Sequence, residues 1–388
     1  MQRDRVVKTP TSVRSIYVHA PFCARRCVYC DFAVTVRRTG DLPAWLDALT
    51  AELDMVEQEG LLVPAASLET LYVGGGTPSL LGAGAMLGLR DVLGPDRLRS
   101  PDLEWTAEAN PESFTPDLAV AWAQAGVNRI SLGLQTFDEA ALRWMGRLHG
   151  ADGPPRAVDL ARDVGIDNVS VDLIFGLPQH LDRSWDDDLT RVLELDVPHV
   201  SLYGLTVEYG TQLGRAVREG KESPVDEEQY RREFLRAAEV LTAAGYVHYE
   251  VSNFARPGRE ARHNAVYWRG DPYLGLGNGA HSFAAPVRRW NVRDWEEYLM
   301  RLAAGAAPEV EREVVDVEGD ALERAWLGLR TRSGIPWSAL GSKQESLVRR
   351  WVSEGLAEGS NGHFRLTVEG WLLLDQLAVD LDDLRDAG

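Results

Sequence analysis

The sequence predicts an α/β fold in which a partial (β/α)6 barrel is followed by a winged-helix-like α+β domain. Strand-like runs alternate with amphipathic helical runs six times in the first part of the 388-residue chain. The turn after the first strand lacks a dinucleotide-binding glycine fingerprint, which favours a barrel over a doubly wound sheet. From about residue 320 this alternation gives way to helices and one hairpin pattern. With 45% hydrophobic residues, the chain is long enough for one large core and an appended domain.

Each part of the barrel is predicted from the period of its apolar residues. Strand-like runs cover residues 16–19, 68–73, 103–109, 129–134, 169–175 and 200–206. Amphipathic helices are predicted between them at 42–57, 84–93, 116–125, 155–164 and 185–195. This succession indicates a parallel sheet with right-handed crossovers. A helix is predicted next at 227–244 and a strand at 247–251, whereas 256–279, rich in Gly, Pro and Asn, is predicted to be an ordered surface loop.

Three segments are expected: the barrel at 1–300, a linker at 301–319 and a winged-helix-like domain at 320–388. The last segment is predicted to contain helices at 320–331, 336–340, 345–354 and from Val368, and a hairpin within 356–366 that turns at Ser360, Asn361 and Gly362. A winged helix can bind DNA, and the alternative is a packing or dimerisation module. From Asp320 onward there are eleven acidic and eight basic residues, which favours the alternative.

Charge and cysteine usage limit the possible partners and compartment. The net charge is −18, and no local basic patch is found, so we expect no nucleic-acid partner. The N-terminal residues Met1 to Arg5 lack the apolar core of a signal peptide, and no run of 18 apolar residues occurs. A cytoplasmic protein is therefore expected. In a reducing compartment, clustered cysteines indicate a metal site and not a disulfide framework.

The chain's only cysteines, Cys23, Cys27 and Cys30, lie within eight positions of one another. Three thiolates at these spacings can ligate three irons of a [4Fe–4S] cluster and leave the fourth iron open to a small chelating molecule. A zinc site is one alternative, but zinc needs a fourth ligand, for which His19 is the nearest histidine. Inert buried cysteines are another. The strand before the cysteines and the aromatic Tyr29 among them favour the cluster.

Polar and glycine residues follow the predicted strands at their carboxyl ends, where barrels hold their active sites. The glycines at 74–76 precede Thr77, and Glu108, Gln135 and Asp172 lie at or near the ends of later strands. Each of these has an ordinary alternative as a turn or a helix cap. Several on one rim after a cysteine loop indicate a binding site, with Arg147 as the predicted partner of a carboxylate.

The cysteine spacing, with Tyr29 at its aromatic position, resembles the Cys-x-x-x-Cys-x-φ-Cys signature of the radical S-adenosylmethionine (SAM) superfamily. The resemblance implies a [4Fe–4S] cluster on Cys23, Cys27 and Cys30. In that superfamily the open iron binds SAM, and an electron from the cluster cleaves it to a 5′-deoxyadenosyl radical. The rim resembles the branch that contains oxygen-independent coproporphyrinogen III oxidase and the heme chaperone HemW. The implied SAM-binding residues are Tyr17, Gly75, Gly76, Thr77, Glu108, Gln135, Arg147 and Asp172. For Tyr17, an ordinary strand aromatic is the alternative.

Two features favour the HemW type over the oxidase. Phe32 stands where the oxidase has a further cysteine, and only 22 residues precede Cys23. The segment with His263, Asn264, Tyr267 and Trp268 is similar to the HemW pattern His-Asn-x-x-Tyr-Trp, which is associated with heme binding in that family. An imidazole can ligate heme iron and the aromatic rings can face a porphyrin. The heme-binding segment is therefore expected at 256–283. The alternative is that these four residues only pack a loop onto the barrel.

The resemblance implies a heme chaperone that binds a [4Fe–4S] cluster, SAM and heme, and transfers heme to client hemoproteins. The alternative is an oxygen-independent coproporphyrinogen III oxidase or another radical SAM enzyme acting on a porphyrin. Client hemoproteins that include membrane-bound respiratory enzymes, a location in the cytoplasm at the membrane periphery, and a homodimer are also expected.

Overall fold

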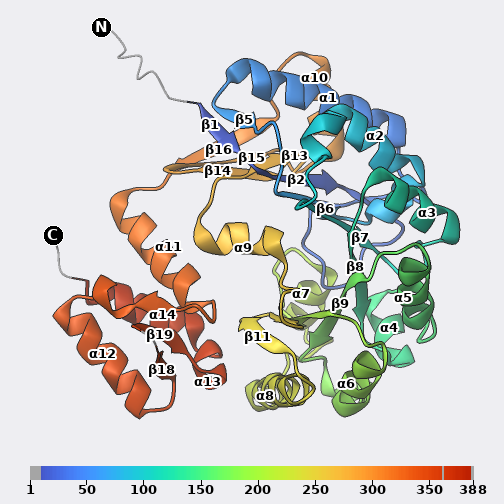
Figure 1. The fold of residues 1–388 in the computed structure, drawn as a ribbon. Coiled ribbons are helices and arrows are strands. Elements are labelled where there is room, and N and C mark those ends of the chain that lie inside the picture. The colour runs from blue at the N-terminus through green and yellow to red at the C-terminus, as the bar shows by residue number, and fades with distance from the viewer. Residues whose placement is uncertain (1–9, 361, 386–388) are drawn as a thin grey trace, which may run out of the picture.

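The structure, a computed structural model that describes residues 10–360 and 362–385, is built around a nine-stranded sheet (Figure 1). Its middle consists of the parallel strands β2 (Ser15–Ala20), β6 (Thr70–Gly75), β7 (Glu104–Ala109), β8 (Arg129–Gln135), β9 (Asn168–Phe175) and β10 (His199–Gly204). They lie side by side in chain order. A doubly wound sheet reverses its strand order at a switch point, and this sheet does not, so the predicted partial (β/α)6 barrel is confirmed.

The sheet stays open within the described residues. One edge is β13 (Leu274–Leu276), which pairs in parallel with β2. At the other edge β12 (Asn253–Ala255) pairs antiparallel with β10 and with β11 (Val247–Glu250). Short pairs flank the sheet: β1 (Thr11–Val13) with β5 (Leu62–Pro64), and β3 (Phe22–Cys23) with β4 (Thr35–Val36).

Helices follow the strands, and in Figure 1 all of them except α7 (Gln212–Arg218) lie along the outer edge of the sheet. They are α1 (Leu42–Glu59), α2 (Gly84–Leu93), α3 (Pro116–Ala125), α4 (Glu139–Met145), α5 (Gly153–Asp163), α6 (Trp185–Glu194), α7 (Gln212–Arg218) and α8 (Glu227–Ala243), with 3-10 turns at η1 (Pro78–Leu81), η2 (Pro95–Leu98) and η3 (Gln179–Leu181). Helix α3 shows why these segments end where they do. The hydroxyl of Thr115 accepts a hydrogen bond from the Leu118 amide at its start, and Gly126 ends it in a left-handed conformation.

Alternation along the parallel strands separates two faces. In β8, Ile130 and Leu132 are fully buried in the apolar core, which includes buried residues of the outer helices. The intervening Ser131 and Gly133 line a cavity on the inner side. Strand β2 repeats the pattern, since Tyr17 lines the cavity between buried aliphatic neighbours. The inner face of the barrel is therefore polar, and it is on this face that a ligand site can form.

The prediction of a surface loop at 256–279 is wrong. The segment contains α9 (Arg262–Arg269) and the edge strand β13, whose three residues are all buried. Only a glycine fits at Gly275, because an added Cβ would lie 2.0 Å from the backbone oxygen of His281. The glycines that signal a loop in the sequence thus serve close packing of a strand in this segment.

Beyond β13 the chain builds a small antiparallel sheet of β14 (His281–Ala284), β15 (Val287–Asn291) and β16 (Glu309–Val314), with α10 (Trp295–Ala303) between the last two. Strand β16 lies within the predicted linker 301–319. The division of the chain at 300 and 319 remains our proposal.

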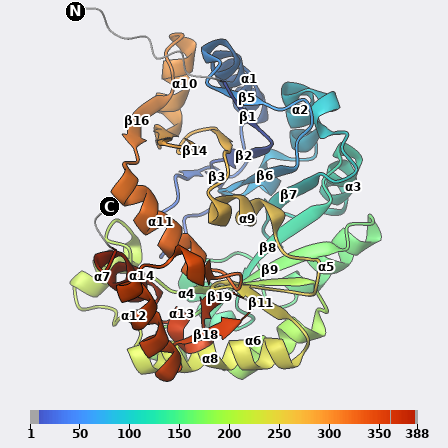
Figure 2. The same cartoon turned by 60° about the vertical axis from the view of Figure 1, so that its left-hand side comes forward.

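The C-terminal unit is the predicted winged-helix-like α+β arrangement. It consists of α11 (Val317–Leu329), β17 (Ile335–Pro336), η4 (Trp337–Ala339), α12 (Ser342–Ser353), β18 (Ala357–Ser360), β19 (His363–Leu366), α13 (Val368–Trp371) and α14 (Leu374–Asp383). Figure 2 shows these elements beside β11 and α8. The backbone joins them, because the Val251 amide donates to the Arg330 oxygen and the Arg332 amide to the Tyr249 oxygen.

Two predictions fall partly or wholly outside the described residues, namely the N-terminal segment from Met1 to Arg5 and the hairpin position Asn361. Among the helices that are described, none is both long and apolar enough to cross a membrane.

Candidate functional site: a cavity at the strand ends

A cavity of about 1150 Å³ opens at the carboxyl ends of the parallel strands. It is lined by the three cysteines and by every residue expected to bind SAM: Tyr17, Gly75, Gly76, Thr77, Glu108, Gln135, Arg147 and Asp172. Ligand sites for one drug-sized molecule occupy roughly 300–1,000 Å³. The cavity therefore has room for more than one small molecule.

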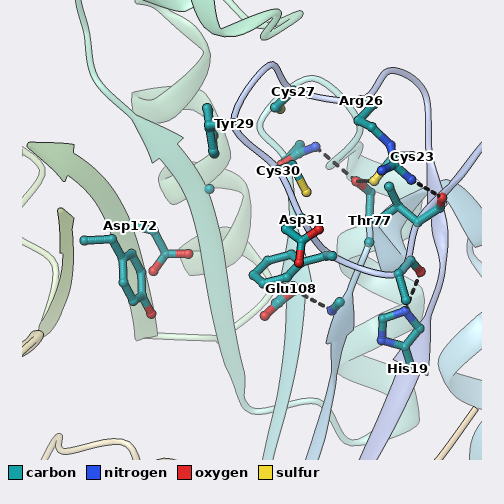
Figure 3. Close-up of a pocket in the computed structure, with 18 of the residues that line it drawn as sticks. His19, Cys23, Arg26, Cys27, Tyr29, Cys30, Asp31, Thr77, Glu108 and Asp172 are labelled. Carbon is teal, nitrogen blue, oxygen red and sulfur yellow. Dashed lines mark hydrogen bonds between the residues drawn. The ribbon is translucent and has the colours of Figure 1, made fainter. Parts of the chain in front are cut away.

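The cysteine loop follows directly from β2 and lies over the strand ends that carry Glu108 and Asp172 (Figure 3). A turn in which the Cys30 amide donates to the Cys27 oxygen, at 3.2 Å, shapes the loop. Cys23 Sγ lies 3.5 Å from the Thr77 hydroxyl, and a guanidinium nitrogen of Arg147 donates to Cys27 Sγ at 3.8 Å. Burial raises the pKa of the Cys23 thiol to about 11. A metal at this site would have to supply the positive charge that favours thiolates.

The three thiols line one cavity without forming a compact site for a single ion. Within the described part of the chain, no three His, Cys, Asp or Glu side chains are grouped to hold one metal ion. His19 offers no fourth zinc ligand, because its Nδ1 lies 2.9 Å from the Tyr17 hydroxyl and its Nε2 lies 2.9 Å from the Ala33 oxygen. In an iron–sulfur cluster each thiolate ligates a different iron, so the three thiols of such a site do not converge on one ion.

The glycines after β6 are required by close packing. A Cβ added at Gly75, where φ is +101°, would lie 2.1 Å from His19 Nδ1 and 2.8 Å from the Tyr17 hydroxyl. At Gly76 it would lie 2.6 Å from the Ala20 oxygen. The glycines thus allow the cysteine loop and the β6 turn to approach each other, and they leave the backbone at the cavity wall open to a ligand.

Two half-buried carboxyl groups, Glu108 and Asp172, face the cavity. Glu108 accepts hydrogen bonds from the Tyr72 hydroxyl at 2.7 Å and from the Gly75 amide at 2.9 Å. Burial raises the pKa of Glu108 to about 7 and raises the pKa of Asp172 above its usual range. Each carboxylate oxygen can accept more than one hydrogen bond, so both groups can still receive the donors of an amine or of ribose hydroxyls.

Arg147 is positioned by its neighbours and keeps one donor unused. One of its terminal nitrogens donates to the Asn110 side chain at 2.6 Å and also to the Gly133 oxygen. Its Nε is buried without a hydrogen-bond partner. The Arg147 side chain also lines the cavity, where the expected carboxylate partner would lie.

Gln135 is turned into the cavity by its backbone, which is left-handed at φ 73° and lies at a register shift between β8 and β9. Such a conformation costs energy in a residue other than glycine and has to be held by its surroundings. The buried Asp188 holds it, since it accepts hydrogen bonds of 2.7 Å from the Thr136 hydroxyl and from the Phe137 amide. The bulge is therefore anchored directly beside Gln135.

The residues predicted to contact heme lie apart from the SAM set, except for Tyr267, which lines the cavity. His263 is buried, and its Nδ1 and Nε2 each lie 2.8 Å from a hydroxyl, those of Thr70 and Tyr267 respectively. Trp268 packs under the Arg330 guanidinium, 4.2 Å from the ring centroid. Asn264 is half-buried on the same helix. The motif joins the barrel interior to the C-terminal unit.

Sequence reasoning missed several residues of the cavity. Asn110, which bridges Thr77 and Arg147, lies two positions after Glu108, and this proximity was the available signal. An aromatic wall in the same cavity has no local signal, because its members come from distant strands and loops. It consists of Tyr203, Tyr267, Tyr273 and Trp290.

Comparison with known proteins places this geometry in a family. The sequence model of the radical SAM superfamily matches residues 17–192. The heme chaperone HemW of Mycobacterium tuberculosis is 36% identical over 373 residues, which cover 94% of this chain and 94% of that protein. The heme chaperone HemW of Escherichia coli is 38% identical over 372 residues, with 94% and 96% covered.

A solved structure shares the fold. Coproporphyrinogen III oxidase (HemN) from Escherichia coli, a radical SAM enzyme, matches with a TM-score of 0.79 over 98% of this chain and 91% of that chain, at 21% identity. The fold is therefore that of a radical SAM protein. Because the identity to HemW extends over almost the whole length, the chain belongs to the HemW family of that superfamily.

Proposed function

We propose that the chain is a heme chaperone that holds a [4Fe–4S] cluster, SAM and heme in one cavity and transfers the heme to client hemoproteins. The observation that carries the proposal is the lining of this cavity. Three cysteines, a polar rim and several aromatic rings line the same cavity. The near full-length similarity to proteins named as heme chaperones supports the choice of ligand.

Each ligand is assigned to residues on the wall. Cys23, Cys27 and Cys30 would hold the cluster, whose open iron, when bound, supplies a chelation site for SAM. Glu108 and Asp172 would accept hydrogen bonds from SAM, and the guanidinium group of Arg147 would donate to its carboxylate. The aromatic wall would cover the flat apolar face of heme.

The cellular setting is part of the proposal. We infer a cytoplasmic protein at the membrane periphery, with clients that include membrane-bound respiratory enzymes. A homodimer is proposed as well, with no nucleic-acid partner.

A reconstitution experiment tests the function. The protein is loaded anaerobically with iron and sulfide and titrated with heme, and the loaded protein is then mixed with the apo form of a b-type cytochrome. Saturable binding followed by transfer to the cytochrome is expected. Failure to bind heme, or release no faster to the cytochrome than to apomyoglobin, a passive acceptor, would contradict the proposal.

The oxidase is the second candidate, because every residue proposed to bind SAM lines the cavity. Phe32, in place of a further cysteine, weighs against it, and the likeness to the oxidase at 21% identity concerns the fold alone. Anaerobic incubation with a reductant, SAM and coproporphyrinogen III decides between the two. Protoporphyrinogen formed over many turnovers would favour the oxidase.

A further inference from the structure

Heme iron bound by a protein takes an axial ligand from it, most familiarly a histidine nitrogen with a free lone pair. The chain has eight histidines, and two of them, His19 and His281, line the cavity. The hydrogen bonds of each ring decide whether a nitrogen is free.

His19 has no free nitrogen. Its Nε2 lies 2.9 Å from the Ala33 carbonyl oxygen, which can only accept, so Nε2 carries the proton. Its Nδ1, 2.9 Å from the Tyr17 hydroxyl, then accepts from that hydroxyl. This histidine positions the cysteine loop and Tyr17, and its lone pair is used.

His263 is engaged in the same way outside the cavity wall. Its ring is 1% exposed, stacks on Tyr72 with centroids 5.2 Å apart, and has both nitrogens in hydrogen bonds. Ligation of iron by His263 would require the ring to leave two hydrogen bonds and a stacking partner. An axial ligand with a free nitrogen must therefore be sought among the other residues that line the cavity.

His281 meets the requirement. It begins β14 at the cavity wall, is exposed, and makes no side-chain hydrogen bond or ion pair with any described residue. Its ring stacks on Trp290 of the neighbouring strand, with centroids 5.4 Å apart and planes at 18°. Desolvation of the ring against its neighbours, together with the positive charges of Arg288 and Arg293, lowers the pKa of His281.

The surroundings of His281 suit an iron porphyrin. The rings of Tyr273 and Trp290 line the same cavity and offer apolar faces. The guanidinium groups of Arg25 and Arg293 also line it. Arg25 forms no ion pair within the described residues. Arg293, whose side chain is 62% exposed, pairs with Asp31 at 3.5 Å and would have to share its guanidinium with a propionate. Two cations at the rim can pair with the two propionates of heme.

We propose that His281 is the axial ligand of heme bound in this cavity, with Trp290 holding the imidazole plane and Arg25 and Arg293 pairing with the propionates. The assignment rests on the proposed heme-binding function, and it replaces the predicted contact through His263 with a residue that has a free nitrogen on the cavity wall.

The test uses the cluster-reconstituted protein with an oxidised cluster, which is diamagnetic and leaves ferric heme as the paramagnet. Heme is titrated into wild type, His281→Ala, His263→Ala and His180→Ala, with difference absorption and electron paramagnetic resonance as readouts. His180 is an exposed histidine paired with Glu222 at 3.6 Å, and it serves as the matched control.

For His281→Ala we expect a heme Kd weaker by about tenfold or more, and a changed ferric heme signal that free imidazole restores. His180→Ala should match wild type, and His263→Ala should keep the wild-type heme signal. A wild-type signal in His281→Ala would overturn the assignment while leaving heme binding in place. No saturable binding by wild type would overturn the proposed function as well. Unchanged circular dichroism of His281→Ala shows that the variant is folded.

Discussion

Glu108 shows how one side chain sets the character of the cavity. It lies on the polar inner face of β7 and is fixed by the Tyr72 hydroxyl and the Gly75 amide. Burial raises its pKa to about 7, which means that the surroundings destabilise the charged carboxylate. A strained or costly group kept at a site is typical of a binding role. In the proposed function its partner is the amine or a ribose hydroxyl of SAM.

Glu108→Gln should weaken SAM binding without unfolding the protein. The amide keeps the shape but loses the charge, and a hydrogen bond to a charged group contributes about 1.5–3 kcal/mol, so SAM affinity should fall by about tenfold or more. Unfolding at pH 8 should be no easier than in wild type, because a desolvated charge is removed. Calorimetric titration with SAM and urea unfolding measure the two effects.

Glu208→Gln is the matched control, since Glu208 lines the same cavity outside the predicted SAM set. Equal SAM affinities for wild type and Glu108→Gln would remove Glu108 from the site.

At the scale of single residues, the sequence predicted which side chains line the cavity where this depends on their position along a strand. Glu108, Gln135 and Asp172 follow from the rule that parallel strands bring their carboxyl ends to one rim, and the structure brings all three to the cavity. The free nitrogen of His281 could not be predicted. It depends on hydrogen bonds, and the sequence does not show which histidine nitrogens those bonds occupy.

At the scale of elements, one buried carboxyl group, that of Glu52 in helix α1, binds the turn that follows the edge strand β13. Glu52 accepts hydrogen bonds from the Gly277 amide at 2.7 Å and the Tyr298 hydroxyl at 2.6 Å, and another from the Asn291 side chain. Through these contacts α1 holds the turn between β13 and β14, directly before His281. Burial raises the pKa of Glu52 to about 7 despite the hydrogen bonds.

Stability should therefore depend on pH through Glu52. Its folded-state pKa lies above the unfolded value, so its contribution is fully present below about pH 4.5 and is lost as pH rises through about 7. Between pH 5 and 8 the free energy of unfolding of wild type should fall by about 2 to 3 kcal/mol relative to that of Glu52→Gln. Urea unfolding at a series of pH values measures the difference. If the free energies of unfolding of wild type and Glu52→Gln changed with pH in the same way, Glu52 would not be the source of the pH dependence.

Elements with their own apolar period were predictable, and elements defined by distant partners were not. The predicted helices at 84–93 and 116–125 match α2 and α3, because each has a complete amphipathic pattern and α3 has clear end signals. Strand β13 has three residues, one of them a glycine, and it is a strand only because β2, more than 250 positions earlier, pairs with it. The small sheet of β14 to β16 depends on similar partners.

Over the whole molecule, the barrel and the C-terminal unit are joined by a buried ion pair. Arg330 Nε lies 3.0 Å from Glu250 Oε2, with Glu250 fully buried and Arg330 15% exposed. The same guanidinium covers Trp268 at 4.2 Å. The heme-associated motif, the edge of the barrel and the C-terminal unit thus meet at Arg330, so a change in one can reach the others.

Arg330→Ala should destabilise the joint by about 3–5 kcal/mol, because it leaves the Glu250 carboxylate buried without its cation. Hydrogen exchange should rise across α11 and β17 to β19 before it rises in β7 and β8. Arg349→Ala removes an exposed pair with Glu345 and should change stability by at most about 1 kcal/mol. Uniform exchange throughout the chain would show that the joint is not a separate unit of stability.

One measurement tests most directly the central claim that a single cavity holds the cluster and heme. Crystals of the reconstituted, heme-loaded protein are examined by anomalous diffraction at the iron edge. We predict one compact group of iron peaks at Cys23, Cys27 and Cys30 and a separate single peak beside His281, within the same cavity. A heme iron peak outside the cavity, or no iron at the three cysteines, would contradict this account.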